Sequence, residues 1–112
     1  MPLEVEGVTL EVDAEGYLVD PAQWTEQVAE ELARQERIVL SAEHWAVIRF
    51  MREYYERHQI APDARHVMKH LAAYKGPDKA ARNDLFVLFP YGYVKQACRI
   101  AGMRRPRAWS TG

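Results

Sequence analysis

The chain has 112 residues, of which 48% are hydrophobic and 28% are charged, and its formal net charge is −1. This composition predicts one globular domain and excludes an intrinsically disordered chain, while the near-neutral charge gives no reason to expect nucleic-acid binding. No apolar run reaches the roughly 18 residues that a membrane-spanning helix needs. The single cysteine and the lack of a signal-peptide pattern at the N-terminus favour a cytoplasmic location.

The first residues predict a β-hairpin over about residues 3–19. Apolar and polar residues alternate from Leu3 to Val12, and a turn sequence from Asp13 to Gly16 precedes a second apolar run. Gly16 can adopt the positive φ that such a turn requires. Because two strands alone are marginally stable, we expect this hairpin to pack on the rest of the chain.

Five helices are predicted after the hairpin, each from a capping signal or an apolar periodicity. Asp20 and Pro21 start the first, Ser41 starts the second and Asp63 starts the third. The expected helices cover about residues 21–35, 42–58, 63–74, 78–87 and 91–101, and residues 102–112 follow as a C-terminal arm. The prediction is an α+β fold, mainly α, in which one domain over residues 1–112 combines the hairpin with a compact helix bundle.

Cys98 is the only thiol and therefore the one candidate for covalent chemistry by the protein itself. A lone cysteine on a helix is more often a small buried hydrophobic residue than a nucleophile. Helical spacing places Cys98 at the edge of the inner face of its helix, next to Lys95 and Arg99, whose charges would lower the thiol pKa. The C-terminal end of a helix has the opposite effect on an anion, so the residues alone leave both interpretations open.

Positive charges gather at and after the last predicted helix and predict a docking surface for an acidic partner or a phosphate. A solvated tail that complements the end of a helix is an equally consistent interpretation. The predicted partner-binding residues are Lys95, Arg99, Arg104, Arg105 and Arg107.

Two further interpretations concern the third predicted helix, where His66 and His70 stand four residues apart with Arg65 and Lys69 beside them. These side chains could meet a phosphate backbone, but the first half of the chain is acidic and no row of base-reading side chains is present. The histidine pair has no carboxylate at a suitable spacing and no CxxC motif to complete a metal site. We therefore expect no metal site and no cofactor, and we do not favour nucleic acid as a partner.

The motifs of the chain, taken together, resemble the DsrC/TusE family of small sulfur-relay proteins, which includes the gamma subunit of dissimilatory sulfite reductase. The resemblance spans about residues 3–106. The matching motifs are Asp13-x-x-Gly16-Tyr17-Leu18, Trp24, Leu40-x-x-x-His44-Trp45-x-Val47-Ile48, Arg52-Glu53-x-Tyr55, Pro62, Arg65, Lys69, Leu88-Phe89-Pro90, Lys95-Gln96-Ala97-Cys98 and Ile100-Ala101-Gly102.

The resemblance implies a hairpin, a bundle of helices and a mobile C-terminal arm, in agreement with the predicted elements. It also implies a sulfur carrier that holds sulfur as a persulfide and acts with sulfite reductase or a TusBCD-like sulfur-transfer complex. In the TusE branch, the sulfur goes on to thiolation of the tRNA wobble uridine. The resemblance thus implies no cofactor and at most a sulfurtransferase-like carrier activity.

The chain departs from this family at the position of the principal thiol. In the family that cysteine is the penultimate residue of the arm, and DsrC proper has a second cysteine eleven residues before it. Cys98 matches the upstream cysteine, and Trp109 stands eleven residues later. We therefore expect altered or lost carrier activity, with Cys98 as the carrier if sulfur is carried. The alternative is a non-catalytic regulatory or binding paralogue.

Overall fold

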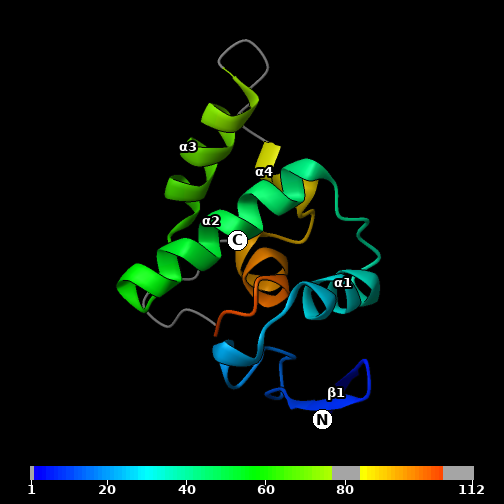
Figure 1. Cartoon of the computed structure of the whole chain (residues 1–112). Coiled ribbons are helices and arrows are strands. Elements are labelled where there is room, and N and C mark those ends of the chain that lie inside the picture. The colour runs from blue at the N-terminus through cyan, green and yellow to red at the C-terminus, as the bar shows by residue number, and fades with distance from the viewer. Residues whose placement is uncertain (1, 77–83, 105–112) are drawn as a thin grey trace.

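Figure 1 shows the computed structural model of the chain, which describes residues 2–76 and 84–104. The hairpin is followed by helices that enclose the C-terminal part of the chain. In chain order the elements are the strands β1 (Pro2–Val5) and β2 (Val8–Glu11), the 3-10 helix η1 (Pro21–Gln23), the α-helices α1 (Glu26–Gln35), α2 (Ala42–His58), α3 (Ala64–Lys75) and α4 (Asp84–Leu88), and the π-helix η2 (Tyr93–Cys98).

The hairpin is tighter than expected, because its two strands are joined at Glu6 and Gly7, before the predicted turn at residues 13–16. Both residues have positive φ, 49° and 80°, as a two-residue turn that matches the twist of a hairpin requires. The antiparallel register pairs Leu3 with Leu10, and both side chains are buried. The turn predicted at Asp13 to Gly16 is also present, but it is followed only by an isolated bridge. The expected long strand from residue 3 to residue 12 is therefore wrong.

The helix expected over residues 21–35 is divided into η1 and α1. Trp24 has an extended backbone, with ψ at 139°, and Thr25 then caps α1 by accepting a hydrogen bond from the Val28 N–H at 3.2 Å. A second capping residue inside the predicted helix starts a new helix in a new direction. As a result the Trp24 side chain turns toward the C-terminal part of the chain, where its indole N–H is bonded.

The second and third helices begin at the expected capping residues. The Ser41 side chain caps α2, and Asp63 caps α3 by accepting a hydrogen bond from the His66 N–H at 3.0 Å. Near the end of α3 the Tyr74 side chain is 53% exposed and does not belong to the core. Part of the helix expected over residues 78–87 lies outside the described residues, and α4 begins at Asp84.

One hydrophobic core joins all these elements. It includes Val28 and Leu32 of α1, Ile48 and Met51 of α2, and residue Ile100 from the end of the chain. Figure 1 shows the C-terminal segment in the middle of the molecule, between α2 and α1. The predicted class, an α+β fold that is mainly α, is confirmed. Within residues 2–76 and 84–104, no helix has both the length and the apolar character that crossing a membrane requires.

Candidate functional site

The candidate site is the thiol segment, which we define as residues 92–103. It begins at Gly92, whose φ of 104° lets the chain turn sharply out of α4. The buried Gln96 side chain then secures this turn, because its oxygen accepts a hydrogen bond from the Tyr91 N–H at 2.9 Å. The segment ends in a Schellman motif: Gly102 has a φ of 76°, its N–H donates to the Arg99 carbonyl at 3.1 Å, and the Met103 N–H donates to the Cys98 carbonyl at 2.9 Å.

The Cys98 thiol is completely buried, with an exposed fraction of 0%. Burial raises its pKa to about 12, and the hydrogen bond with the Tyr93 hydroxyl opposes this rise only in part. Tyr93 is also buried; its hydroxyl donates to the Pro62 carbonyl, and burial raises the Tyr93 pKa. The thiol is therefore protonated and shielded at neutral pH.

This geometry answers the question that the sequence left open about the thiol pKa. The expected position at the edge of the helix is wrong, because the wider π-helical turn brings both Ala97 and Cys98 into the core. Lys95 is exposed, and Arg99 directs its guanidinium to groups other than the thiol. The neighbouring positive charges thus do not lower the Cys98 pKa, and burial decides it.

The Arg99 side chain makes structural contacts with other parts of the chain. Its guanidinium forms an ion pair with Glu36 at the end of α1, and it donates to the Gly16 carbonyl at 3.2 Å and to the Gln35 side chain at 3.0 Å. Glu36 also accepts a hydrogen bond from the Gln96 amide at 2.8 Å. Glu36 therefore ties the thiol segment to α1, while Arg99 adds a tie to the second turn of the N-terminal region.

The predicted basic docking residues do not form one surface in the described part of the chain. Arg99 is mostly buried by its partners, while Lys95 is exposed. Arg104 is exposed and donates to the Val19 carbonyl at 3.1 Å. Arg105 and Arg107 lie outside the described residues. Their grouping as a partner-binding surface stays a prediction.

A second set of contacts fixes the end of the thiol segment; we call Trp24, Arg52 and Gly102 the C-terminal clamp. The Trp24 indole N–H donates to the Ile100 carbonyl at 2.9 Å, and Arg52 donates to the Ala101 carbonyl at 3.1 Å. The Arg52 guanidinium also lies over the Trp24 ring, 4.7 Å from its centroid. Gly102 is packed so closely that a Cβ atom there would lie 2.4 Å from the indole.

His44 secures the segment that leads into the site from α4. Its Nε2 lies 2.9 Å from the Leu88 carbonyl, and its Nδ1 lies 2.7 Å from the Ser41 hydroxyl. Burial lowers the His44 pKa, so the ring is neutral with its proton on Nε2, which leaves Nδ1 as an acceptor. The ring also packs edge-on against Phe89. His44 thus acts as a structural side chain.

Sequence reasoning did not identify Tyr93, Gln96 or Glu36 as parts of the site. Gln96 had one available signal, since it belongs to the motif that contains Cys98. Glu36 had none, because its contacts with the thiol segment join residues 60 or more positions apart.

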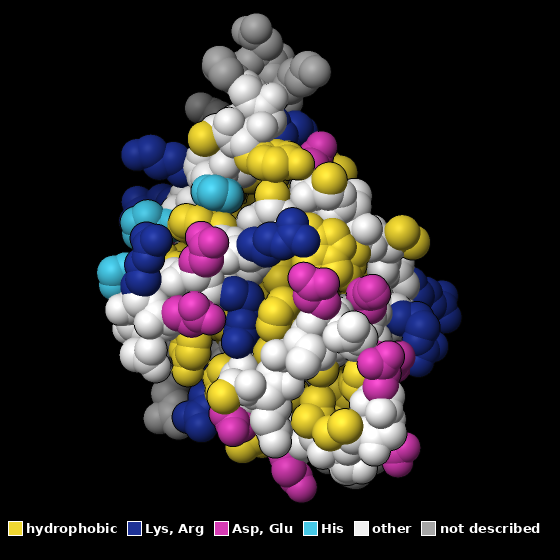
Figure 2. Space-filling view, viewed as in Figure 1, with side chains coloured by type: hydrophobic (Ala, Val, Ile, Leu, Met, Phe, Trp, Pro, Cys, Tyr) yellow, Lys and Arg dark blue, Asp and Glu magenta, His cyan; other side chains and the backbone are white. Residues whose placement is uncertain are grey.

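The histidines of α3 contact neighbouring side chains on the face of α2 and α3, where Figure 2 shows histidine side chains gathered; His66 is exposed and His70 is half-buried. His66 pairs with Asp63 at 3.1 Å, and His70 stacks on Phe50 with 4.3 Å between ring centroids. The part of the chain that the structure describes contains no group of three or more side chains arranged to hold a metal ion.

Known proteins share both this sequence and this fold. Residues 4–108 match the family described as DsrC like protein. This chain belongs to the DsrC family. Sulfurtransferase TusE of Pectobacterium atrosepticum is 43% identical over 104 residues, covering 93% of this chain and 95% of the relative. TusE of Salmonella typhimurium is 44% identical over 101 residues, covering 90% and 93%.

Solved DsrC structures superpose on nearly the whole chain. The oxidized gamma-subunit of the dissimilatory sulfite reductase (DsrC) from Archaeoglobus fulgidus has a TM-score of 0.88 at 37% identity, covering 98% of this chain and all of the other. The NMR structure of Allochromatium vinosum DsrC has a TM-score of 0.84 at 43% identity, with the same coverage. The predicted family is confirmed, and a sulfur-relay role at the level of the family follows. The DsrC match ends one residue before Trp109.

Proposed function

We propose that this DsrC-family protein acts in a sulfur relay by binding a relay partner, and that the folded chain does not itself carry sulfur. The observation that carries this proposal is the complete burial of Cys98, with a pKa raised to about 12. At pH 7 only roughly one thiol in 100,000 with this pKa is ionised, and the thiolate is the form that attacks sulfur. The absence of a cysteine at position 109 supports the same conclusion.

The partner is a sulfite reductase or a TusBCD-like sulfur-transfer complex. This choice is supported by relatives that bear the names sulfurtransferase TusE and gamma-subunit of the dissimilatory sulfite reductase. A family member that occupies the partner's docking site without a working thiol would compete with the carrier and so regulate the relay. We place this activity in the cytoplasm, where free thiols stay reduced.

A second candidate function is sulfur transfer through Cys98 after the thiol segment opens. It is favoured by the π-helical turn at the thiol, since such turns occur frequently at functional sites. The Cys98 thiolate would attack the outer sulfur of a donor persulfide, form a new S–S bond, and release the donor as a thiolate. An acceptor thiolate then attacks the outer sulfur of the Cys98 persulfide, and Cys98 is released as a thiolate.

Intact-protein mass spectrometry after incubation with glutathione persulfide separates the two candidates. We expect the folded protein to gain no sulfur, and the urea-unfolded protein to gain about 32 Da, the mass of one sulfur atom. Cys98→Ser is the control and should gain nothing under either condition. Rapid persulfidation of the folded wild type would replace our proposal with the carrier function.

Partner binding is tested with purified sulfite reductase and with a purified TusBCD-like complex, each immobilised for affinity measurements. We expect one of them to bind the wild type and Cys98→Ser with equal affinity, since the thiol is buried away from any partner. Failure of both to bind would refute the proposed function.

A further inference from the structure

A hollow of about 440 Å³ opens between the end of α1 and the start of α2. Its apolar wall is formed by Ala33, Ile38, Leu40 and Trp45, and none of its residues belongs to the thiol segment. Val39 on its rim is 88% exposed. The size of the hollow is suited to one or two large apolar side chains, and the connection from α1 to α2 leaves it open to solvent.

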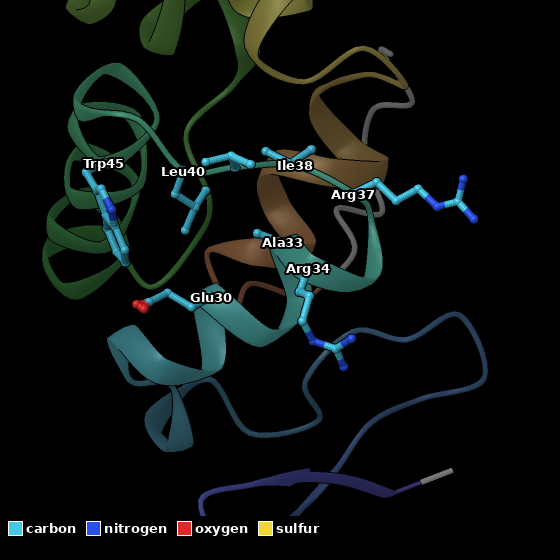
Figure 3. Close-up of a pocket in the computed structure, with 8 residues that line it drawn as sticks. Glu30, Ala33, Arg34, Arg37, Ile38, Leu40 and Trp45 are labelled. Carbon is cyan, nitrogen blue, oxygen red and sulfur yellow. The ribbon is translucent and has the colours of Figure 1, made fainter.

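The charges around the hollow are unevenly placed. Figure 3 shows Arg34 and Arg37 at one end, with the Arg37 side chain directed outward at the rim, and Trp45 at the other end with Glu30 nearer to it. Arg34 forms an ion pair with Glu31 at 2.6 Å, while Arg37 is exposed and has no partner among the described residues. Figure 2 shows the same character on the surface, with hydrophobic side chains over this region flanked by acidic groups and by a basic cluster at the edge. A ligand with an apolar side chain and a carboxylate therefore has one favourable orientation.

The backbone conformation of Arg37 is an independent reason to assign its side chain a role in binding. Arg37 has a φ of 60°, the left-handed conformation that glycine adopts most easily. It is the residue after the α1 cap: its N–H donates to the Arg34 carbonyl at 3.0 Å, and the next N–H, of Ile38, donates to the Ala33 carbonyl at 2.9 Å. Glycine is the usual residue at this position of such a helix end. An arginine is held here at a conformational cost, and its guanidinium forms no hydrogen bond or ion pair with residues 2–76 or 84–104.

We propose that this α1–α2 hollow is a docking site for an extended segment of a partner protein, in which an apolar side chain stands next to an aspartate or glutamate. The apolar side chain would enter against Trp45 and Leu40, and the carboxylate would pair with Arg37. Glu30 disfavours the reverse orientation by repelling a carboxylate at its end. The inference goes beyond the proposed function, because it names a binding surface and the chemistry of its ligand, and neither depends on which relay partner binds.

The test is an NMR titration of the full chain with the blocked peptide acetyl-Ala-Leu-Phe-Glu-Glu-amide. We expect saturable shifts of the Trp45 indole N–H and the Ile38 amide, and a weaker effect from the same peptide with glutamine for glutamate. Arg37→Gly should weaken binding about fivefold, as the loss of one charge-assisted hydrogen bond at a surface predicts. The melting temperature of this variant should stay the same or rise, because glycine relieves the backbone at this position.

Arg65→Gln is the matched control, since Arg65 is an exposed arginine on α3 away from the hollow. It should bind the peptide as the wild type does. The proposal is overturned if the wild type shows no saturable shift at peptide concentrations up to about 10 mM, if the glutamine peptide binds equally, or if Arg37→Gly binds unchanged. Binding of the intact relay complex to the wild type is measured separately, so that the proposed function can hold while this inference fails.

Discussion

Two neighbouring charged residues at the end of α1, Glu36 and Arg37, have opposite environments. Glu36, on one side, is held by Gln96 and Arg99 and so fixes the thiol segment in the core. Arg37, the next residue, has no partner among the described residues and stands at the rim of the open hollow. Internal contacts immobilise the one thiol, while groups suited to recognition stay at the surface. This difference favours binding over thiol chemistry as the role of the folded chain.

Among variants that loosen the buried thiol segment, Gly102→Ala should lose the most stability. The new methyl group would lie 2.4 Å from the Trp24 ring, at a backbone φ of 76° that already disfavours alanine. We expect the free energy of unfolding to fall by about 3 kcal/mol, through overpacking and backbone strain together. Urea denaturation at pH 7 measures this change.

Gly7→Ala is the matched control for that variant. Gly7 also has a positive φ, 80°, but nothing lies within 4 Å of the position that a Cβ atom would take. The free energy of unfolding of Gly7→Ala should therefore fall by only about 1 kcal/mol, from backbone strain alone. Equal losses in the two variants would show that the contact between Gly102 and Trp24 is unimportant.

Arg52→Lys tests how far the C-terminal clamp holds the thiol segment closed, because it loosens the clamp without removing its charge. A lysine cannot donate both to the Ala101 carbonyl and to the Pro21 carbonyl in the geometry that the guanidinium uses. We expect a loss of about 2 kcal/mol in the free energy of unfolding. The rate at which iodoacetamide alkylates Cys98 should rise in parallel, because the same contacts close the segment over the thiol.

Arg49→Lys, on the same helix, is the control for the clamp. Arg49 is exposed and lies over the Trp45 ring, with 5.6 Å between its guanidinium carbon and the ring centroid. It should leave both the unfolding midpoint and the alkylation rate unchanged. An Arg52→Lys variant that loses stability without faster alkylation would separate the clamp from access to the thiol.

The parts of the fold that the sequence could predict are those set by local signals. Ser41 and Asp63 cap their helices through their own side chains, and the sequence shows both. The turn at Glu6 and Gly7 was missed because a non-glycine residue occupies one of its positive φ positions. Such a residue gives no clear turn signal, and Gly7 alone reads only as an interruption of the strand.

The candidate site was harder to predict, because distant residues determine its chemistry. Lys95 and Arg99 lie near Cys98 in the sequence and favour an activated thiol, while the end of a helix opposes one, so the residues alone left the question open. The structure closes that thiol with a π-helical turn and with contacts from α1 and α2, none of which has a periodic pattern in the sequence. A pKa that depends on burial cannot be obtained from the residues next to the thiol.

The pH dependence of stability tests the burial of the thiol directly. The pKa of Cys98 is raised from 9.0 to about 12 on folding, so the unfolded chain ionises first as the pH rises. Stability from this group is complete below pH 9 and falls by about 1.4 kcal/mol per pH unit between pH 9 and pH 12. Cys98→Ala lacks this dependence.

We expect the wild type to exceed Cys98→Ala by about 1 kcal/mol at pH 7, the contribution of a small buried side chain, and this advantage to disappear near pH 10. Urea denaturation of both proteins at pH 7, 9 and 10 gives the difference. An advantage that stays constant across this range would mean that the folded thiol ionises normally.

The smallest expected loss of stability comes from Glu36, which joins the end of α1 to the thiol segment. Glu36→Gln keeps the size of the side chain but removes the charge that Arg99 pairs with, and it presents an N–H₂ group to one of two donors. Both side chains of the ion pair are about one fifth exposed, so solvent screens part of the interaction. We expect a loss of about 1 kcal/mol and faster amide exchange in η2.

Glu31→Gln provides the comparison from the open side of α1. Glu31 also pairs with an arginine, Arg34, but that arginine is 73% exposed, and the pair spans one helical turn. Its removal should change neither the unfolding midpoint nor exchange in η2, because water replaces the lost contact. If both variants behaved alike, Glu36 would be one more surface charge and the thiol segment would be held by the core and the clamp alone. If only Glu36→Gln frees η2, Glu36 is the contact through which the end of α1 holds the thiol segment in place.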